Sequence, residues 1–165
     1  MSKLSKTVEK QIFVLVGPHN SGKTSTLMEV FNVLNDKYPK GKRNIILPRK
    51  LLTETNVKID IKIEKSYDIR DIRITIEIGE NLIGIESCGD PSGYDCLRVA
   101  LKKYFSPNCN IIFCAARPND KKINKLINSY SKNITPIEKA IEHNKQLHSK
   151  SNLEMAEYLI KAAGL

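Results

Sequence analysis

Eight residues near the amino terminus have the types and the spacing needed to hold phosphate. Gly17, Gly22, Lys23 and Thr24 fit the pattern of a glycine, four variable residues, a glycine, a lysine and a serine or threonine. The glycines allow the backbone N–H groups to wrap around anionic oxygens, Lys23 would reach the β- and γ-phosphates, and the Thr24 hydroxyl would ligate Mg²⁺. We therefore expect a nucleotide to contact Gly17, Pro18, His19, Asn20, Ser21, Gly22, Lys23, Thr24 and Ser25.

A strand and a helix must flank such a loop. Residues 11–16 form a continuous apolar run of strand length, which is typical of a parallel strand covered on both faces. After Gly22, the apolar residues Leu27, Val30 and Leu34 recur at helical spacing. The amino end of that helix adds unpaired N–H donors and a partial positive charge, so the context favours a phosphate site over a glycine-rich turn.

The stretch GPHNSGKT resembles the Walker A motif of P-loop NTPases. The motif match is specific for residues 17–24, and the remainder of the chain is similar by pattern to small bacterial or phage ATP-binding proteins of this class. The resemblance implies a three-layer α/β fold with a mostly parallel sheet, here with an antiparallel hairpin, and ATP and Mg²⁺ as cofactors. We expect residues 1–165 to form a single domain of this kind.

The resemblance also implies an acid that supports Mg²⁺ from the end of a neighbouring strand. Asp90, in GDPSG, resembles the Asp-x-x-Gly element of switch-type P-loop proteins, whereas Glu86, in ESCG, offers the same element with Gly89 at the γ-phosphate. We favour Asp90, because its shorter carboxylate follows the strand while Glu86 still lies within it. The alternative is that Asp90 or Ser92 caps the next helix.

The base is expected to be adenine rather than guanine. An acid that follows an antiparallel excursion resembles the Ras-like arrangement, but guanine-specific members carry Asn-Lys-x-Asp. This chain has only Asn124-Lys125-Leu126-Ile127 and Asn144-Lys145-Gln146-Leu147, which lack the aspartate. The sequence therefore favours ATP over GTP, without indicating an adenine pocket.

Two further residues are candidates for the site. Arg117 follows the apolar run of residues 110–115, at the sheet edge where open α/β proteins bind ligands. Its guanidinium could stabilise charge on a transferred phosphoryl group, which makes Lys23, Asp90 and Arg117 the candidate catalytic residues, or it could be an ordinary surface arginine. His19 could touch the γ-phosphate or point outward.

The rest of the chain predicts alternating strands and helices. Apolar residues with a period of two predict antiparallel strands with one exposed face over residues 57–63 and 72–78. Thr135-Pro136 has the form of a helix start, but the alternation of crossover helices with parallel strands favours a final strand over residues 134–141. A capping box of Ser151 and Glu154 should open the last helix. The other expected elements are strands at 43–47, 82–87 and 110–115, and helices at 94–104, 120–131 and 151–163.

Composition limits the class of protein and its partners. The four cysteines lack a Cys-x-x-Cys pair, so we expect reduced, structural thiols. The longest apolar run before Gly17 has six residues, too few for a signal peptide or a membrane span, so we expect a cytoplasmic protein with no membrane contact. The net charge is +9, concentrated in residues 36–50 and 117–150, which indicates a nucleotide, a nucleic acid or another anionic partner, or a solvated lysine face.

These observations lead to three functional hypotheses. The first is a Mg-ATP-binding P-loop NTPase that hydrolyses ATP as a regulatory switch or transfers its γ-phosphate. The second is a small-molecule or nucleotide kinase, which Arg117 alone supports poorly because nucleotide-kinase lids usually carry several arginines. The third is a nucleotide-dependent nucleic-acid-binding module that would use both basic regions. The acceptor is not encoded in the nucleotide motif.

Overall fold

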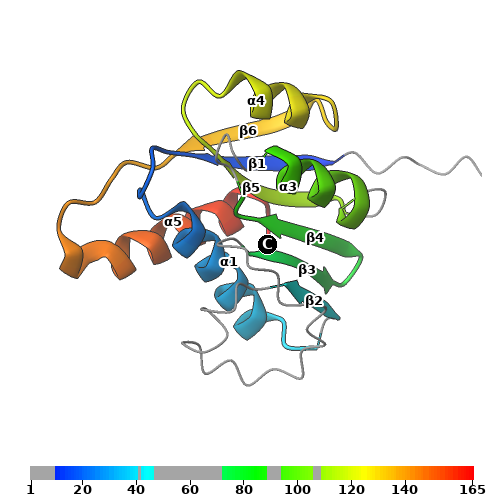
Figure 1. Ribbon diagram of the computed structural model, residues 1–165. Coiled ribbons are helices and arrows are strands. Elements are labelled where there is room, and N and C mark those ends of the chain that lie inside the picture. Colours follow the sequence, from blue (N-terminus) through cyan, green and yellow to red (C-terminus); the bar gives the residue numbers. More distant parts are fainter. Residues whose placement is uncertain (1–9, 41, 47–71, 89–93, 106–108) are drawn as a thin grey trace, which may run out of the picture.

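The computed structural model describes residues 10–40, 42–46, 72–88, 94–105 and 109–165, and within them six strands form one sheet (Figure 1). The strands are β1 (Gln11–Val16), β2 (Arg43–Ile46), β3 (Arg73–Ile78), β4 (Asn81–Glu86), β5 (Ile111–Ala116) and β6 (Asn133–Glu138). The helices are α1 (Lys23–Lys37), α3 (Tyr94–Val99), the π-helical η2 (Ala100–Tyr104), α4 (Lys121–Asn128), the 3₁₀ helix η3 (Lys145–Leu147) and α5 (His148–Ala162).

The sheet has the order β2-β3-β4-β5-β1-β6 and combines a parallel part with an antiparallel part. Strands β4, β5, β1 and β6 run parallel to one another, whereas β3 pairs antiparallel with both β2 and β4. Gly79 makes the tight β3–β4 turn with a φ of +58°, in the left-handed region that glycine adopts readily. The expected mostly parallel sheet with an antiparallel hairpin is confirmed.

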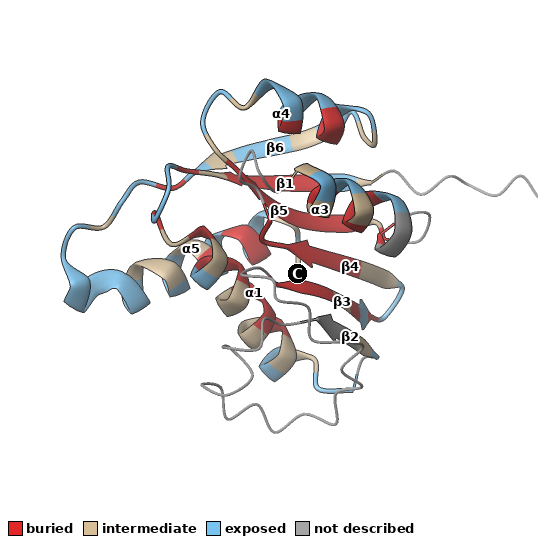
Figure 2. Ribbon diagram, viewed as in Figure 1, coloured by how far each residue is buried: buried red, intermediate tan, exposed pale blue. Residues whose placement is uncertain are grey.

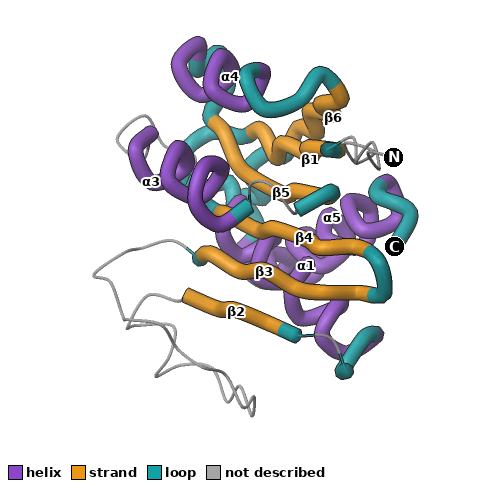
Figure 3. Tube along the Cα trace, turned by 90° about the vertical axis from the view of Figure 1, so that its right-hand side faces the viewer, coloured by secondary structure: helices purple, strands orange, loops and turns teal. Residues whose placement is uncertain are grey.

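Helices cover both faces of the sheet, which gives the expected three-layer α/β arrangement (Figure 3). On one face, α1 and α5 bury Phe31, Leu34 and Leu159 against apolar residues of β1, β3, β4 and β5. On the other face, α3, η2 and α4 bury Leu97 and Ile123 against β1 and β5. Burial of these two apolar clusters provides the main driving force for folding.

Strand β5 lies at the centre of the core, as the red colour of Figure 2 shows. All six of its residues are buried, which explains its unbroken apolar sequence. Beside it, Gly84 of β4 interrupts the alternation because a Cβ there would lie 2.7 Å from the Phe105 ring. Phe105 is fully buried, so glycine at position 84 makes room for the aromatic ring.

The carboxyl-terminal segment both agrees with and departs from the sequence predictions. The final strand is confirmed as β6, and Pro136 is tolerated there because β6 is an edge strand. The capping box at Ser151 and Glu154 is wrong, since α5 already begins at His148. The Ser151 hydroxyl accepts from Lys139 Nζ (3.4 Å) instead, and Glu154 faces Lys150 at 3.9 Å. The predicted strand over 57–63 lies outside the described residues.

Two cysteines fit the structural role expected from composition. Burial raises the pKa of Cys109 to about 12, against the opposing effect of Lys10. Burial and the nearby Glu86 carboxylate raise the pKa of Cys114 to about 12 as well. Both thiols therefore stay protonated and unreactive near neutral pH. In the described part of the chain, no helix has the length and apolar character that crossing a bilayer requires.

Candidate anion-binding site

Residues 17–22, called the 17–22 loop below, join the carboxyl end of β1 to the amino end of α1. The Gly17 N–H donates to the Ala116 carbonyl at the end of β5 (3.1 Å), and the Lys139 N–H donates to the Val16 carbonyl (2.7 Å) just beyond β6. The loop therefore starts between the carboxyl ends of two flanking parallel strands. Open α/β proteins bind their ligands at this edge of the sheet.

Both glycines of the loop stand where a side chain would not fit. A Cβ on Gly17 would lie 2.5 Å from Ser21 Oγ and 2.7 Å from the Lys139 carbonyl oxygen. A Cβ on Gly22 would lie 2.7 Å from Asn152 Oδ1, and the Gly22 φ of +83° is itself unfavourable for other residues. The glycines thus allow β6 and α5 to pack directly against the loop backbone.

Lys23, predicted to reach the phosphates, turns back over the 17–22 loop. Its Nζ donates to the carbonyls of Gly17 and Pro18, each at 2.7 Å, and the residue is only 9% exposed. The ammonium group is thus held at the loop before any ligand arrives. A phosphate oxygen is a stronger acceptor than a carbonyl because the hydrogen bond is charge-assisted on both sides.

The amino end of α1 is left open to an anion. Gly22 is the N-cap residue and makes no side-chain capping bond, and the first turn of α1 contains no acidic residue. The partial positive charge of this helix end is therefore not neutralised locally. Ser21 is only 5% exposed, and its buried Oγ has no hydrogen-bond partner among the described residues. Buried hydroxyls are normally satisfied, so Ser21 Oγ is a candidate hydrogen-bond partner for a ligand oxygen.

Lys139 is a second buried lysine at the loop, and sequence reasoning missed it. It is 3% exposed, its Nζ donates to Ser151 Oγ, and its Cε lies 3.3 Å from the position that a Gly22 Cβ would occupy. Burial lowers the pKa of Lys139, while the Glu142 carboxylate opposes that shift. The available signal was its place directly after the final strand, whose end shares the loop's edge of the sheet.

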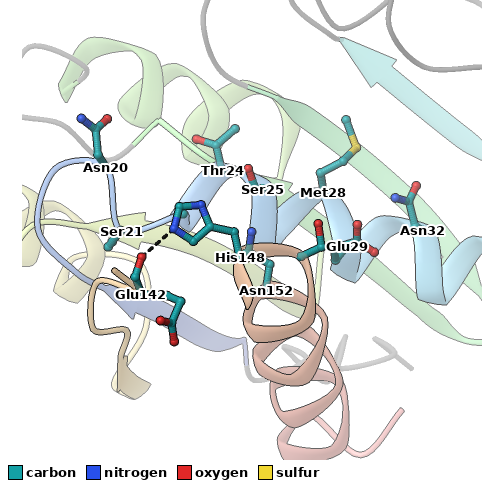
Figure 4. Close-up of a pocket in the computed structure, with 12 residues that line it drawn as sticks. Asn20, Ser21, Thr24, Ser25, Met28, Glu29, Asn32, Glu142, His148 and Asn152 are labelled. Atoms are coloured by element: carbon teal, nitrogen blue, oxygen red, sulfur yellow. Dashed lines mark hydrogen bonds between the residues drawn. The ribbon is translucent and has the colours of Figure 1, made fainter. Parts of the chain in front are cut away.

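A cavity of about 450 Å³ opens beside the loop, between α1 and α5 (Figure 4). Thr24, Ser25, Met28, Glu29 and Asn32 of α1 form one wall, together with Asn20, Ser21 and Gly22 of the loop. The opposite wall consists of Glu142, His148, Ser149 and Asn152. None of the described residues that line the cavity is a lysine or an arginine.

Two hydrogen bonds fix the far wall of this cavity. His148 Nε2 lies 2.6 Å from the Glu142 carbonyl oxygen, as drawn in Figure 4. Thr26 Oγ1 donates to Asn152 Oδ1 at 3.3 Å and so joins α1 to α5. The Thr26–Asn152 contact joins residues 126 positions apart, which is why the cavity could not be predicted from the motif.

No family model matches this chain, and neither does any curated protein or solved structure. Its function is therefore inferred from the site itself.

The structure brings two predicted residues together at the rim of the loop. Arg117 Nη2 lies 3.2 Å from His19 Nδ1, and His19 is exposed. Arg117 directly follows β5, and β5 pairs with β1, so both side chains lie at neighbouring strand ends.

Glu86, the second candidate for the metal, is engaged in a buried ion pair. Its Oε2 accepts from Arg73 Nε at 2.7 Å, and Glu86 is 2% exposed. Arg73 Nη2 also donates to the Cys96 carbonyl (2.9 Å), so the guanidinium holds Glu86 against α3. In the sheet, β5 lies between β4 and β1, so β4 is not the immediate neighbour of β1. Two strand spacings amount to roughly 10 Å.

Of the remaining residues predicted at the metal and the γ-phosphate, Thr24 lies among the described residues. Thr24 lies in the first turn of α1 and is half-buried, whereas Gly89 and Asp90 lie outside the described residues. In the described ranges, no group of three or more His, Cys, Asp or Glu side chains could hold a metal ion.

Part of the second basic region forms an exposed face of α4. Lys121, Lys122 and Lys125 are exposed there, while Ile123 and Leu126 face the core. Asp120 caps this helix by accepting from the Ile123 N–H at 3.1 Å. This pattern is that of an ordinary amphipathic surface helix with a positive outer face.

Proposed function

We propose that this protein is a P-loop NTPase that binds Mg-ATP at the 17–22 loop and the first turn of α1, and hydrolyses ATP or transfers its γ-phosphate. The observation that supports the proposal most strongly is the position of Lys23 Nζ on the loop carbonyls, beside an uncapped helix end. A lysine ammonium, a helix dipole and an orphan hydroxyl at one place suit a polyanion.

The residues of the loop would divide the binding of the phosphates among them. The N–H groups of the loop and the first turn of α1 would donate to phosphate oxygens, and Lys23 would leave the carbonyls for the β- and γ-phosphates. Thr24 would place its hydroxyl on the metal. The bound nucleotide would supply the phosphoryl group, and Mg²⁺ would neutralise its charge.

Asp90 is the acid that we propose for the metal. Its competitor Glu86 already has a buried cationic partner, and removing a carboxylate from such a pair leaves an uncompensated charge. Arg117, beside His19 at the rim, is the proposed contact for charge that develops on the γ-phosphate.

Hydrolysis is favoured over transfer to an organic acceptor. A kinase lid usually presents several arginines. Here Arg73 is ion-paired with Glu86, and among the described residues Arg117 is the arginine that lies at the rim of the loop. We therefore expect turnover of ATP without an added metabolite. Turnover that requires an acceptor would instead support the kinase hypothesis.

The proposal is tested by calorimetric titration of Mg-ATP into the wild type and Lys23→Ala. Loss of a charge-assisted contact to phosphate should weaken binding by about 10- to 100-fold. The matched control is Lys37→Ala, which removes an exposed lysine from the other end of the same helix. Equal affinities of Lys23→Ala and Lys37→Ala, with circular dichroism showing that both are folded, would refute the proposal.

A further inference from the structure

We infer that the cavity between α1 and α5 receives the nucleoside half of the nucleotide, so that α5 takes part in selecting the ligand. This inference rests on the function proposed above and adds a location for the part of the ligand that the phosphate motif does not hold. The phosphate motif does not predict such a pocket, because the far wall is made by Glu142, His148, Ser149 and Asn152.

The position and the size of the cavity suit this role. Its near wall includes Ser21, Gly22 and Thr24, so the cavity adjoins the phosphate site directly. A volume of about 450 Å³ falls within the usual range for sites that bind small organic ligands.

The distribution of charge decides which half of the ligand lies where. Lys23 and Lys139 stand at the loop, whereas the cavity lining has the carboxylates of Glu29 and Glu142 and no described lysine or arginine. A triphosphate carries about four negative charges, so it is attracted to the loop and repelled by the cavity. The neutral nucleoside is therefore the half that fits the cavity.

The chemistry of the lining matches a nucleoside. Asn32 carries a donor and an acceptor side by side, which is the pattern that an adenine edge also presents, whereas Asn152 Oδ1 already accepts from Thr26 Oγ1. Met28 supplies a thioether that packs well against an aromatic ring. The Glu29 carboxylate can accept hydrogen bonds from sugar hydroxyls, whereas Glu142 Oε1 already accepts from the Asn144 N–H at 2.9 Å.

The inference is tested by filling the cavity and comparing two ligands. Ser149 lines the cavity from α5 and is exposed, so Ser149→Trp should occupy the space without touching the loop. The two probes are Mg-ATP and inorganic tripolyphosphate, which share the phosphates but not the nucleoside. The matched control is Gln146→Trp, an exposed residue three positions earlier that is not part of the lining.

We expect Ser149→Trp to weaken ATP binding at least tenfold and to leave tripolyphosphate binding within twofold of the wild type. Gln146→Trp should change neither. Asn32→Ala is a smaller change in α1, two turns after Thr24. It should weaken ATP binding severalfold and leave tripolyphosphate binding unchanged, and it tests the inference even if Ser149→Trp fails to fold.

Two results would overturn the inference while leaving the proposed function intact. One is an ATP affinity that Ser149→Trp and Asn32→Ala leave unchanged. The other is an equal loss of ATP and tripolyphosphate binding in both variants, which would mean that the loop itself is disturbed. A wild type that binds neither probe would refute the proposed function together with the inference.

Discussion

Two ammonium groups are held against one short stretch of backbone in this protein. Lys23 uses the carbonyls of Gly17 and Pro18, whereas Lys139 is buried between the loop and Ser151. The Lys23 ammonium is stabilised by two carbonyl hydrogen bonds, whereas burial lowers the pKa of Lys139 and so disfavours its charged form. At the residue scale, two cationic side chains therefore lie at the loop, which suits the negatively charged ligand that we propose.

The lowered pKa of Lys139 predicts how stability depends on pH. Burial holds this pKa below its usual 10.5 in the folded protein, so the unfolded chain binds more protons in the alkaline window below 10.5. The free energy of unfolding of the ligand-free protein should then gain a rising contribution from Lys139 as the pH increases through that window. Lys139→Met should lack this contribution and be more stable than the wild type at neutral pH.

Urea unfolding at neutral pH and at pH about 10 measures this difference. The control is Lys132→Met, which removes an exposed lysine just before β6. A pH dependence of Lys139→Met that equals those of the wild type and Lys132→Met would contradict the assigned cost of burial.

At the scale of elements, the contact between β4 and η2 depends on one glycine. A Cβ at position 84 would approach three atoms of the Phe105 ring to 2.7–2.9 Å, and the buried ring has little room to move. Gly84→Ala should therefore destabilise the protein by about 1–3 kcal/mol through overpacking. Thermal or urea unfolding measures the change.

A double-mutant cycle isolates this contact. Phe105→Ala removes the three ring atoms that the new methyl group would meet, so Gly84→Ala should cost clearly less in that background. The same cost in both backgrounds would mean that the Phe105 ring is not what restricts position 84.

The elements themselves could be predicted because their signals are local. The apolar run of β1, the helical spacing of α1, the alternation in β3 and the turn at Gly79 all lie within short windows. The start of α5 could not be predicted in this way. Ser151 has a suitable capping sequence, yet its hydroxyl is used by Lys139, and Asn152 is held by Thr26. Long-range contacts have overridden the local preference.

At the scale of the whole molecule, strand order determines which predicted residues can meet. The parallel part of the sheet brings the ends of β5 and β6 to either side of β1, which places Arg117 and Lys139 near the loop. It also places β5 between β1 and β4 and leaves Glu86 facing Arg73. Strand order is a long-range property, so the sequence motif identified the loop but not its neighbours.

The most direct test of phosphate binding is a crystal structure of the full chain with Mg²⁺ and a non-hydrolysable ATP analogue. We expect phosphate oxygens to accept from the N–H groups at the start of α1, and Lys23 Nζ to have moved from the Gly17 and Pro18 carbonyls to a phosphate. A nucleotide bound elsewhere, with Lys23 still on both carbonyls, would contradict the assignment of the loop as the phosphate site.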